Sequence, residues 1–106
     1  MKLESGPFIT RHALERFQQH FPGAGFRFML FDIKDGFAID SQMAALLTGR
    51  RPPRAQSKSQ YILSSRKQGI HVLEPSQADK MKNVVVTYLR LPLEQQQFAE
   101  EQWIAA

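Results

Sequence analysis

The sequence predicts a single α+β domain, with an N-terminal helix or helices and a C-terminal helix packed against one face of a small antiparallel β-sheet. Two observations predict this class. Two capped segments with helical periodicity lie in the first half, and three short apolar runs rich in β-branched residues follow in the second half. The chain of 106 residues fits one domain over 1–106, and its hydrophobic content of 42% is enough for one core.

The first expected helix covers residues 11–20. Thr10 before it is a good N-cap residue, and a Pro-Gly pair follows it. Ala13, Phe17 and Phe21 recur at a spacing of four, which predicts one buried stripe along the helix.

Residues 26–39 have two interpretations. The aromatic run 26–33 suits a buried strand, and the Asp-Gly pair after it signals a turn, so we favour a β-hairpin. The spacing of Phe26, Leu30 and Ile33 would equally form one face of a helix.

The rest of the chain predicts two helices and three strands. A short helix over 41–48 has Asp40 as its N-cap and a glycine after its end, and a closing helix spans 93–104. Phe98, Ala99 and Trp103 should pack that last helix on the sheet. The expected strands are 61–64, 69–73 and 84–91, the first two joined by a turn over 66–69.

The last strand mixes polar residues with a run of valines, which favours a central position. Strict alternation places Tyr88 and Arg90 on one face with Val84 and Val86, and Thr87 on the other face with Val85 and Leu89.

Charge is distributed unevenly along a chain with a net charge of +4. Residues 41–73 contain no acidic residue, whereas after Arg90 the chain has glutamates and no base. The bases of the central stretch are Arg50, Arg51, Arg54, Lys58, Arg66 and Lys67. Such a stretch attracts phosphates, so we expect RNA as a partner; the alternative is a solvated loop without a binding role.

Several classes of protein are excluded or disfavoured. The absence of cysteine excludes a disulfide scaffold, a thiolate zinc site and a cysteine nucleophile. Three histidines, at 12, 20 and 71, have no recognised ligand spacing, so we expect neither a metal nor another cofactor. No apolar run is long enough to span a membrane, and the first residues lack the apolar stretch of a secretory signal, so we expect a cytoplasmic protein.

Two pairs of residues suit chemistry on a phosphate. His12 and Arg16 are four apart on the first helix, where arginine can bind an anion and histidine can transfer a proton. Alternatively they form an ordinary polar flank. Arg90 can bind an anion and Tyr88 can stack on a base, or both can belong to the edge of the core. His71, alone on a strand, is expected to be a half-buried structural residue.

The segment Ile9-Thr10-Arg11-His12-Ala13-Leu14-Glu15-Arg16-Phe17 resembles the I-T-x-H-A-L-x-R-F opening of small bacterial and phage toxin-like domains. Segments 61–63, 69–73 and 85–91 agree in order with the strands of those domains, whose architecture is similar to RelE and colicin-type ribonucleases. The resemblance covers about half of the chain and omits residues 24–60.

The resemblance implies metal-independent cleavage of RNA, in which a 2′-hydroxyl attacks the adjacent phosphorus. His12 would be the acid or base, Arg16 and Arg90 would stabilise the phosphate, and Thr87 would lie near them. Tyr61 or Tyr88 would stack on a base. The bases that would hold the strand are Arg50, Arg51, Arg54, Lys58, Arg66 and Lys67.

Three hypotheses follow. The first is a toxin-type ribonuclease that an acidic antitoxin or immunity protein inhibits. The second is a non-catalytic phage or bacterial module that docks on nucleic acid or a host protein through the basic loop. The third is a homodimer formed through the aromatic segment, whose rings are Phe26, Phe28, Phe31 and Phe37.

Overall fold

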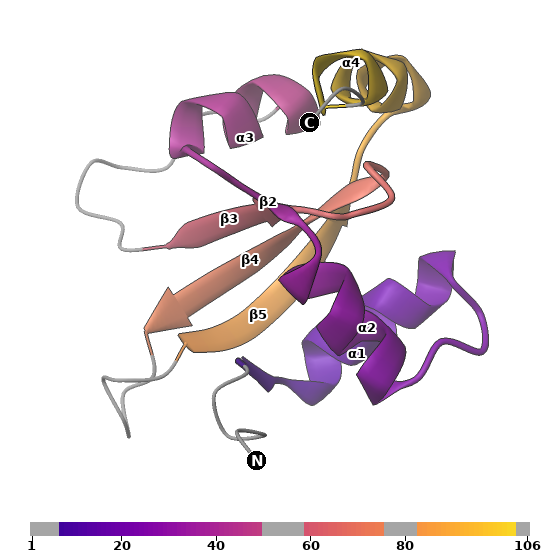
Figure 1. The fold of residues 1–106 in the computed structure, drawn as a ribbon. Helices are drawn as coiled ribbons and strands as arrows, with labels where there is room; N and C mark the ends of the chain where they lie inside the picture. Colours follow the sequence, from indigo (N-terminus) through magenta and orange to yellow (C-terminus); the bar gives the residue numbers. More distant parts are fainter. Residues whose placement is uncertain (1–6, 50–58, 76–82, 104–106) are drawn as a thin grey trace.

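A computed structural model describes residues 7–49, 59–75 and 83–103 (Figure 1). These residues form four helices and five strands, which confirms the α+β class. In chain order the elements are β1 (Phe8–Ile9), α1 (Arg11–His20), α2 (Phe26–Lys34), β2 (Phe37–Ile39), α3 (Ser41–Thr48), β3 (Gln60–Leu63), β4 (Gly69–Pro75), β5 (Asn83–Arg90) and α4 (Leu93–Trp103). The expected strands are therefore present, with ends that differ by one or two residues.

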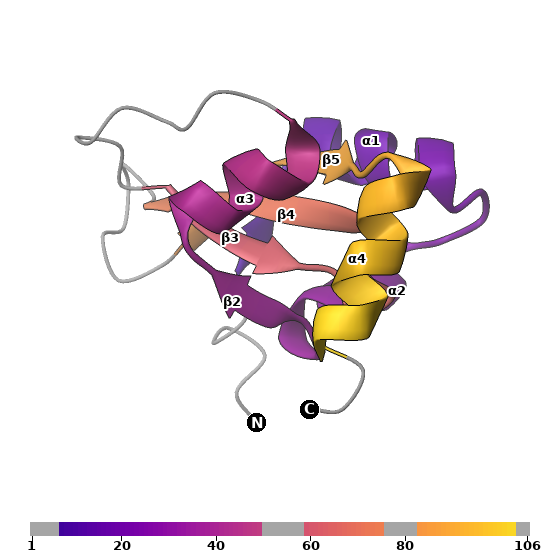
Figure 2. The same ribbon diagram turned by 90° about the horizontal axis from the view of Figure 1, so that it is seen from above.

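The strands form one sheet in the order β1-β5-β4-β3-β2 (Figure 2). Three neighbouring pairs are antiparallel, but β1 runs parallel to β5 through Phe8 and Ile9, so the sheet is mixed rather than purely antiparallel. Strand β1 was not expected, since a run of two residues is too short to give a strand pattern.

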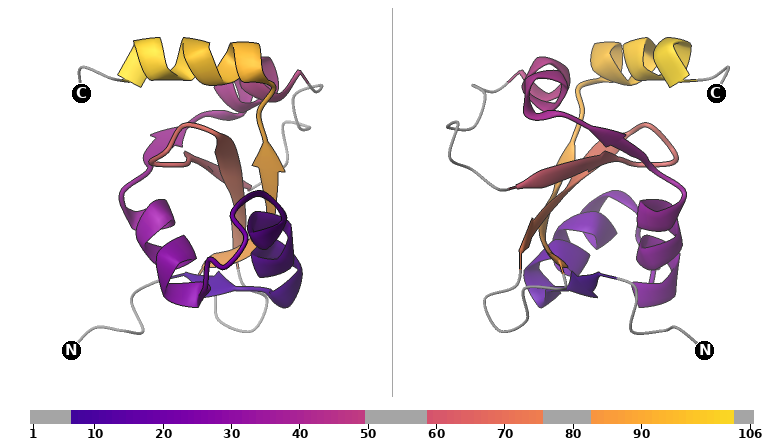
Figure 3. Two further views of the ribbon diagram at one scale, coloured as in Figure 1. Left: turned by 90° about the vertical axis from the view of Figure 1, so that its right-hand side faces the viewer. Right: turned by 60° about the vertical axis from the view of Figure 1, so that its left-hand side comes forward.

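Helices cover both faces of the sheet, whereas we expected them on one (Figure 3). The first core lies between the sheet and the α1–α2 pair, and the second lies between the sheet and the α3–α4 pair. The first core consists of Ile9, Ala13, Phe17, Ala24, Met29, Ile33, Leu73, Val85 and Tyr88. The second consists of Ala44, Leu47, Leu63, Ile70, Leu91 and Ala99.

Helix α1 has the bounds that its cap and stripe predict. The hydroxyl of Thr10 accepts a hydrogen bond from the amide of Ala13 at 3.1 Å and donates one to the carbonyl oxygen of Val85 at 2.9 Å. The N-cap thus also fastens the start of α1 to β5. Ala13 and Phe17 are fully buried, as their spacing predicts.

Segment 26–34 is a helix, so the hairpin that we favoured is wrong. The residues that α2 buries are Met29, Asp32 and Ile33, which share one helical face. Phe26, Phe28 and Phe31 are exposed instead. The expected return strand exists as β2, but it pairs with β3 at the edge of the sheet.

Helices α3 and α4 also follow their sequence signals. Asp40 caps α3 by accepting from the amide of Met43 at 2.7 Å, and Gly49 ends it in the left-handed conformation with φ of 73°. Phe98 and Ala99 pack α4 onto the second core, as expected. The side chain of Trp103 and residue 104 lie outside the described residues.

A β-bulge changes which residues of β5 share a face. Leu73 pairs with Val85 and Val72 pairs with Thr87, so Val86 has no partner on β4. Val85 therefore joins Tyr88 in the core under α1 and α2, contrary to the strict alternation that we expected.

Candidate functional site

The predicted site residues fall into three groups in the structure. Arg50, Arg51, Arg54 and Lys58 lie outside the described residues, so their proposed contact with RNA stays a prediction. The second group is exposed on the α1–α2 side of the molecule and consists of His12, Arg16, Arg66 and Arg90. The third group lies in the sheet or towards its β2 edge and consists of Tyr61, Lys67, Thr87 and Tyr88.

His12 and Arg16 are both exposed on α1, and His20 continues the same helical face one turn later. Thr87 lies on the other face of the sheet, because it pairs with Val72 next to the α3–α4 core. The structure therefore does not bring His12 together with Thr87.

Arg16, His20 and Arg90 form a basic group where α1 ends above the end of β5. Partial burial and the positive charges of Arg90 and Arg16 together lower the pKa of His20. The imidazole of His20 also lies against the ring of Tyr88, with 5.9 Å between the ring centres. The group thus combines two guanidinium ions with a histidine that favours its neutral form.

Aromatic rings continue this basic group towards the turn between β3 and β4. The guanidinium of Arg66 lies 4.6 Å from the ring centre of Phe28 and 5.9 Å from that of Phe21. The rings of Phe21 and Phe28 are 6.3 Å apart. We call the set Arg16, His20, Phe21, Phe28, Arg66 and Arg90 the basic–aromatic surface.

Neither tyrosine is placed to stack on a base at this surface. Tyr88 is 1% exposed, and burial and the charge of Asp32 raise the pKa of its hydroxyl. Tyr61 is half-buried and packs against the second core, on the opposite face of the sheet. Lys67 turns towards β2, with its ammonium 5.2 Å from the ring centre of Phe37.

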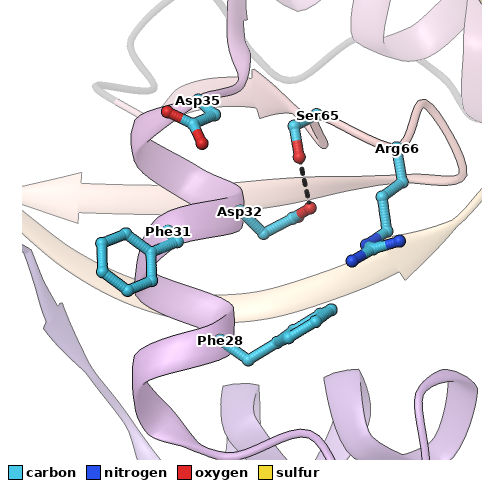
Figure 4. A pocket seen from close by; sticks show the side chains of 6 residues that line it. All are labelled: Phe28, Phe31, Asp32, Asp35, Ser65 and Arg66. Carbon is cyan, nitrogen blue, oxygen red and sulfur yellow. Dashed lines mark hydrogen bonds between the residues drawn. The ribbon is translucent and has the colours of Figure 1, made fainter.

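A buried polar network lies beneath the basic–aromatic surface and was not predicted. Oδ2 of Asp32 lies 2.6 Å from Nε2 of His71 and accepts a hydrogen bond from Ser64 at 2.7 Å. Oδ1 of Asp32 accepts from Ser65 at 2.8 Å (Figure 4). His71 is fully buried, not half-buried as expected.

The network keeps Asp32 ionised. Burial raises the pKa of its carboxyl, but the hydrogen bonds from His71, Ser64 and Ser65 and the coulombic effect of His71 outweigh burial, so the pKa is lowered overall. Because an ionised carboxylate only accepts, Nε2 of His71 carries the hydrogen of this contact. Two buried atoms, Nδ1 of His71 and the Tyr88 hydroxyl oxygen, have no hydrogen-bond partner among the described residues.

A pocket of about 130 Å³ opens over this network, between α2 and the β3–β4 turn (Figure 4). Its lining residues are Phe28, Phe31, Asp32, Asp35, Ser65 and Arg66. Two of these, Phe28 and Arg66, also belong to the basic–aromatic surface, so the pocket and that surface are continuous.

Within residues 7–49, 59–75 and 83–103, no group of three or more potential metal ligands comes together. No helix of the described part is long and apolar enough to cross a membrane. Comparisons of the chain with protein-family models, curated proteins and solved structures found no match. The resemblance to toxin-like domains therefore stays a hypothesis.

Sequence reasoning missed Asp32 because it lies in an aromatic run that we assigned to a strand. Our helical alternative placed the buried face on Phe26, Leu30 and Ile33, whereas α2 buries Met29, Asp32 and Ile33. A helix with its face at Met29 and Ile33 also buries Asp32, and a buried charged residue needs a partner. His71, on a central strand, was then the available partner. That pairing was the one signal that could have revealed the network.

Proposed function

We propose that this protein binds single-stranded RNA in the cytoplasm through the basic–aromatic surface. The observation that carries the proposal is the continuity of cations and rings from Arg16 and Arg90 through Phe21 to Arg66. Arginines bind phosphates, and unpaired bases stack on aromatic rings and guanidinium planes. An open surface suits a single strand better than a deep groove would.

The ion pairing of the arginines supports phosphate binding at Arg16 and Arg90 rather than at Arg11. Arg11 is paired with Glu15 at 3.3 Å, so its charge is compensated. Neither Arg16 nor Arg90 forms an ion pair with a described residue. A phosphate would therefore gain more from Arg16 or Arg90 than from Arg11.

Fluorescence anisotropy of a labelled single-stranded RNA, titrated at several salt concentrations, tests the proposal. Each phosphate contact on a single strand adds about 0.7 to the slope of log affinity against log salt. We expect Arg16→Ala and Arg90→Ala each to lower the slope by about 0.7. Arg11→Ala is the matched control and should leave it nearly unchanged. Equal effects of all three variants, or no binding at about 50 mM salt, would reject the proposal.

A second candidate function is metal-independent cleavage of the bound RNA, favoured by the lowered pKa of His20 between two arginines. A neutral imidazole can take the proton of a 2′-hydroxyl, whose oxygen then attacks the neighbouring phosphorus, while the P–O5′ bond breaks and the leaving 5′-oxygen takes a proton from water. Arg16 and Arg90 would stabilise the charge on the phosphoryl oxygens. This assignment replaces His12 as the base but keeps both arginines of the original hypothesis.

Incubation of RNA with the protein and EDTA tests cleavage separately from binding. The reaction should give a 2′,3′-cyclic phosphate end, and His20→Ala should slow it by about 10²–10⁴-fold. His12→Ala is the companion variant, which should retain most of the activity. Intact RNA would leave a binding protein without catalysis, and activity that His12→Ala removes would restore the first assignment.

A further inference from the structure

The pocket beside α2 has a wall that only accepts hydrogen bonds. Asp32 and Asp35 present carboxylate oxygens to it, one helical turn apart. The hydrogen of the Ser65 hydroxyl is already donated to Oδ1 of Asp32, so Ser65 offers its oxygen lone pair. A ligand that satisfies this wall must supply adjacent N–H or O–H donors.

The opposite wall of the pocket offers hydrogen-bond donors. The guanidinium of Arg66 points towards the ring of Phe28 at the mouth of the pocket (Figure 4). Arg66 has five N–H donors in a planar fork, and the described structure gives it ring contacts but no ion pair. A ligand that reaches this wall must therefore carry acceptors on the edge that adjoins its donors.

The size and shape of the pocket limit the ligand further. A volume of about 130 Å³ corresponds to about four water molecules, so it holds the edge of one planar group rather than a whole nucleotide. Phe31, 61% exposed, and Phe28, 37% exposed, supply apolar surface on α2 beside it. A flat heterocycle with polar edges fits these conditions.

We propose that this pocket takes the base of an unstacked guanosine in the bound RNA. Guanine is the RNA base that carries two neighbouring donors, N1–H and the N2 amine, next to two acceptors, O6 and N7. Carboxylates bind the donor pair, and arginine is the usual partner of O6 and N7. Adenine, cytosine and uracil each lack one half of this pattern.

The inference rests on the proposed RNA binding and gives it a sequence preference. The pocket shares Phe28 and Arg66 with the basic–aromatic surface, so one strand can place phosphates at Arg16 and Arg90 and a base in the pocket. The arginines would then set affinity for any sequence, and the pocket would set the preference for guanine.

The test uses the full chain and short labelled RNAs that differ at one central base: guanine, inosine, adenine, cytosine or uracil. Inosine lacks only the N2 amine. We expect guanine to bind about tenfold more tightly than inosine. Asp35→Asn should reduce this ratio, because the neutral amide oxygen is a weaker acceptor than the carboxylate. Glu101→Gln is the matched control, because Glu101 is an exposed carboxylate on α4, on the other face of the sheet.

The outcomes separate the two proposals. Equal, salt-dependent binding of all five RNAs would overturn the guanine pocket and leave RNA binding intact. If no RNA binds, both proposals fail, unless 5′-guanosine monophosphate shifts the amide resonances of Asp35 and Ser65, in which case the pocket stands without the RNA surface. A guanine preference that Asp35→Asn leaves unchanged would also overturn the pocket.

Discussion

The Asp32→Ala variant tests whether the buried network holds α2 against the sheet. The change removes the acceptor of three hydrogen bonds, at 2.6, 2.7 and 2.8 Å, of which those from His71 and Ser64 are fully buried. Leaving one buried donor unsatisfied costs about 1–3 kcal/mol, and the change leaves two buried donors without their acceptor, so we expect a loss of about 2–6 kcal/mol. A domain of this size is stable by about 5–15 kcal/mol, so the variant should lose a large share of its stability.

Urea unfolding followed by circular dichroism at pH 7 measures this loss. Asp35→Asn is the control, since Asp35 is an exposed aspartate at the C-cap of α2, and its change should stay within about 0.5 kcal/mol. A loss below about 1 kcal/mol for Asp32→Ala would refute the reasoning, because the network would then contribute little more than a surface contact.

The pH dependence of the free energy of unfolding tests the same network in a second way. The pKa of Asp32 is lower in the folded protein than in the unfolded chain, so ionisation stabilises the fold above the unfolded pKa. This contribution is lost as the pH falls through the folded value. The difference in stability between wild type and Asp32→Ala should therefore shrink below about pH 4. A difference that stays constant from pH 7 to the acid limit would contradict the ionised state.

Three further predictions concern single positions. Thr10→Val should cost about 1–3 kcal/mol in the free energy of unfolding, because it removes two hydrogen bonds without changing the shape of the side chain, while Thr10→Ser should cost much less. Gly69→Ala should lower the urea midpoint by the equivalent of about 1–3 kcal/mol, since a Cβ there would overlap the buried ring of Tyr88; an unchanged midpoint would show that the ring can move. A proton NMR titration should give His20 a pKa below the ordinary histidine value of 6.5, and Arg90→Ala should raise it; no change would exclude coupling of the two charges.

The structure followed the sequence wherever local signals agreed. Thr10 and Asp40 cap helices because their side chains satisfy free amides within three residues, which depends on nothing distant. The strands of the second half were likewise recognisable from composition. Such local interactions and local composition account for α1, α3 and most of the strands of the sheet.

The errors arose where distant contacts decide local structure. The apolar pattern of 26–34 fits both a strand and a helix, and in the helix Asp32 accepts a hydrogen bond from His71, 39 residues away. The bulge at Val86 has the same origin, since it lets Val85 and Tyr88 both reach the core beneath α1. Neither the Asp32–His71 hydrogen bond nor the bulge produces a periodic pattern in the sequence.

The candidate site depends on this long-range contact as much as the fold does. Asp32 faces His71 on its inner side and Ser65 on its outer side, so one carboxylate joins α2 to both β4 and the β3–β4 turn. That junction sets the exposed face of α2 opposite Arg66. Phe28 already lies against the rings of Phe17 and Phe21 and the guanidinium of Arg66, so a base that stacks on it would cost the ring little freedom, which lowers the entropic cost of binding. Under the proposed function, the exposed rings of α2 serve as a surface for flat ligands, and the buried carboxylate of Asp32 orients the helix that carries them.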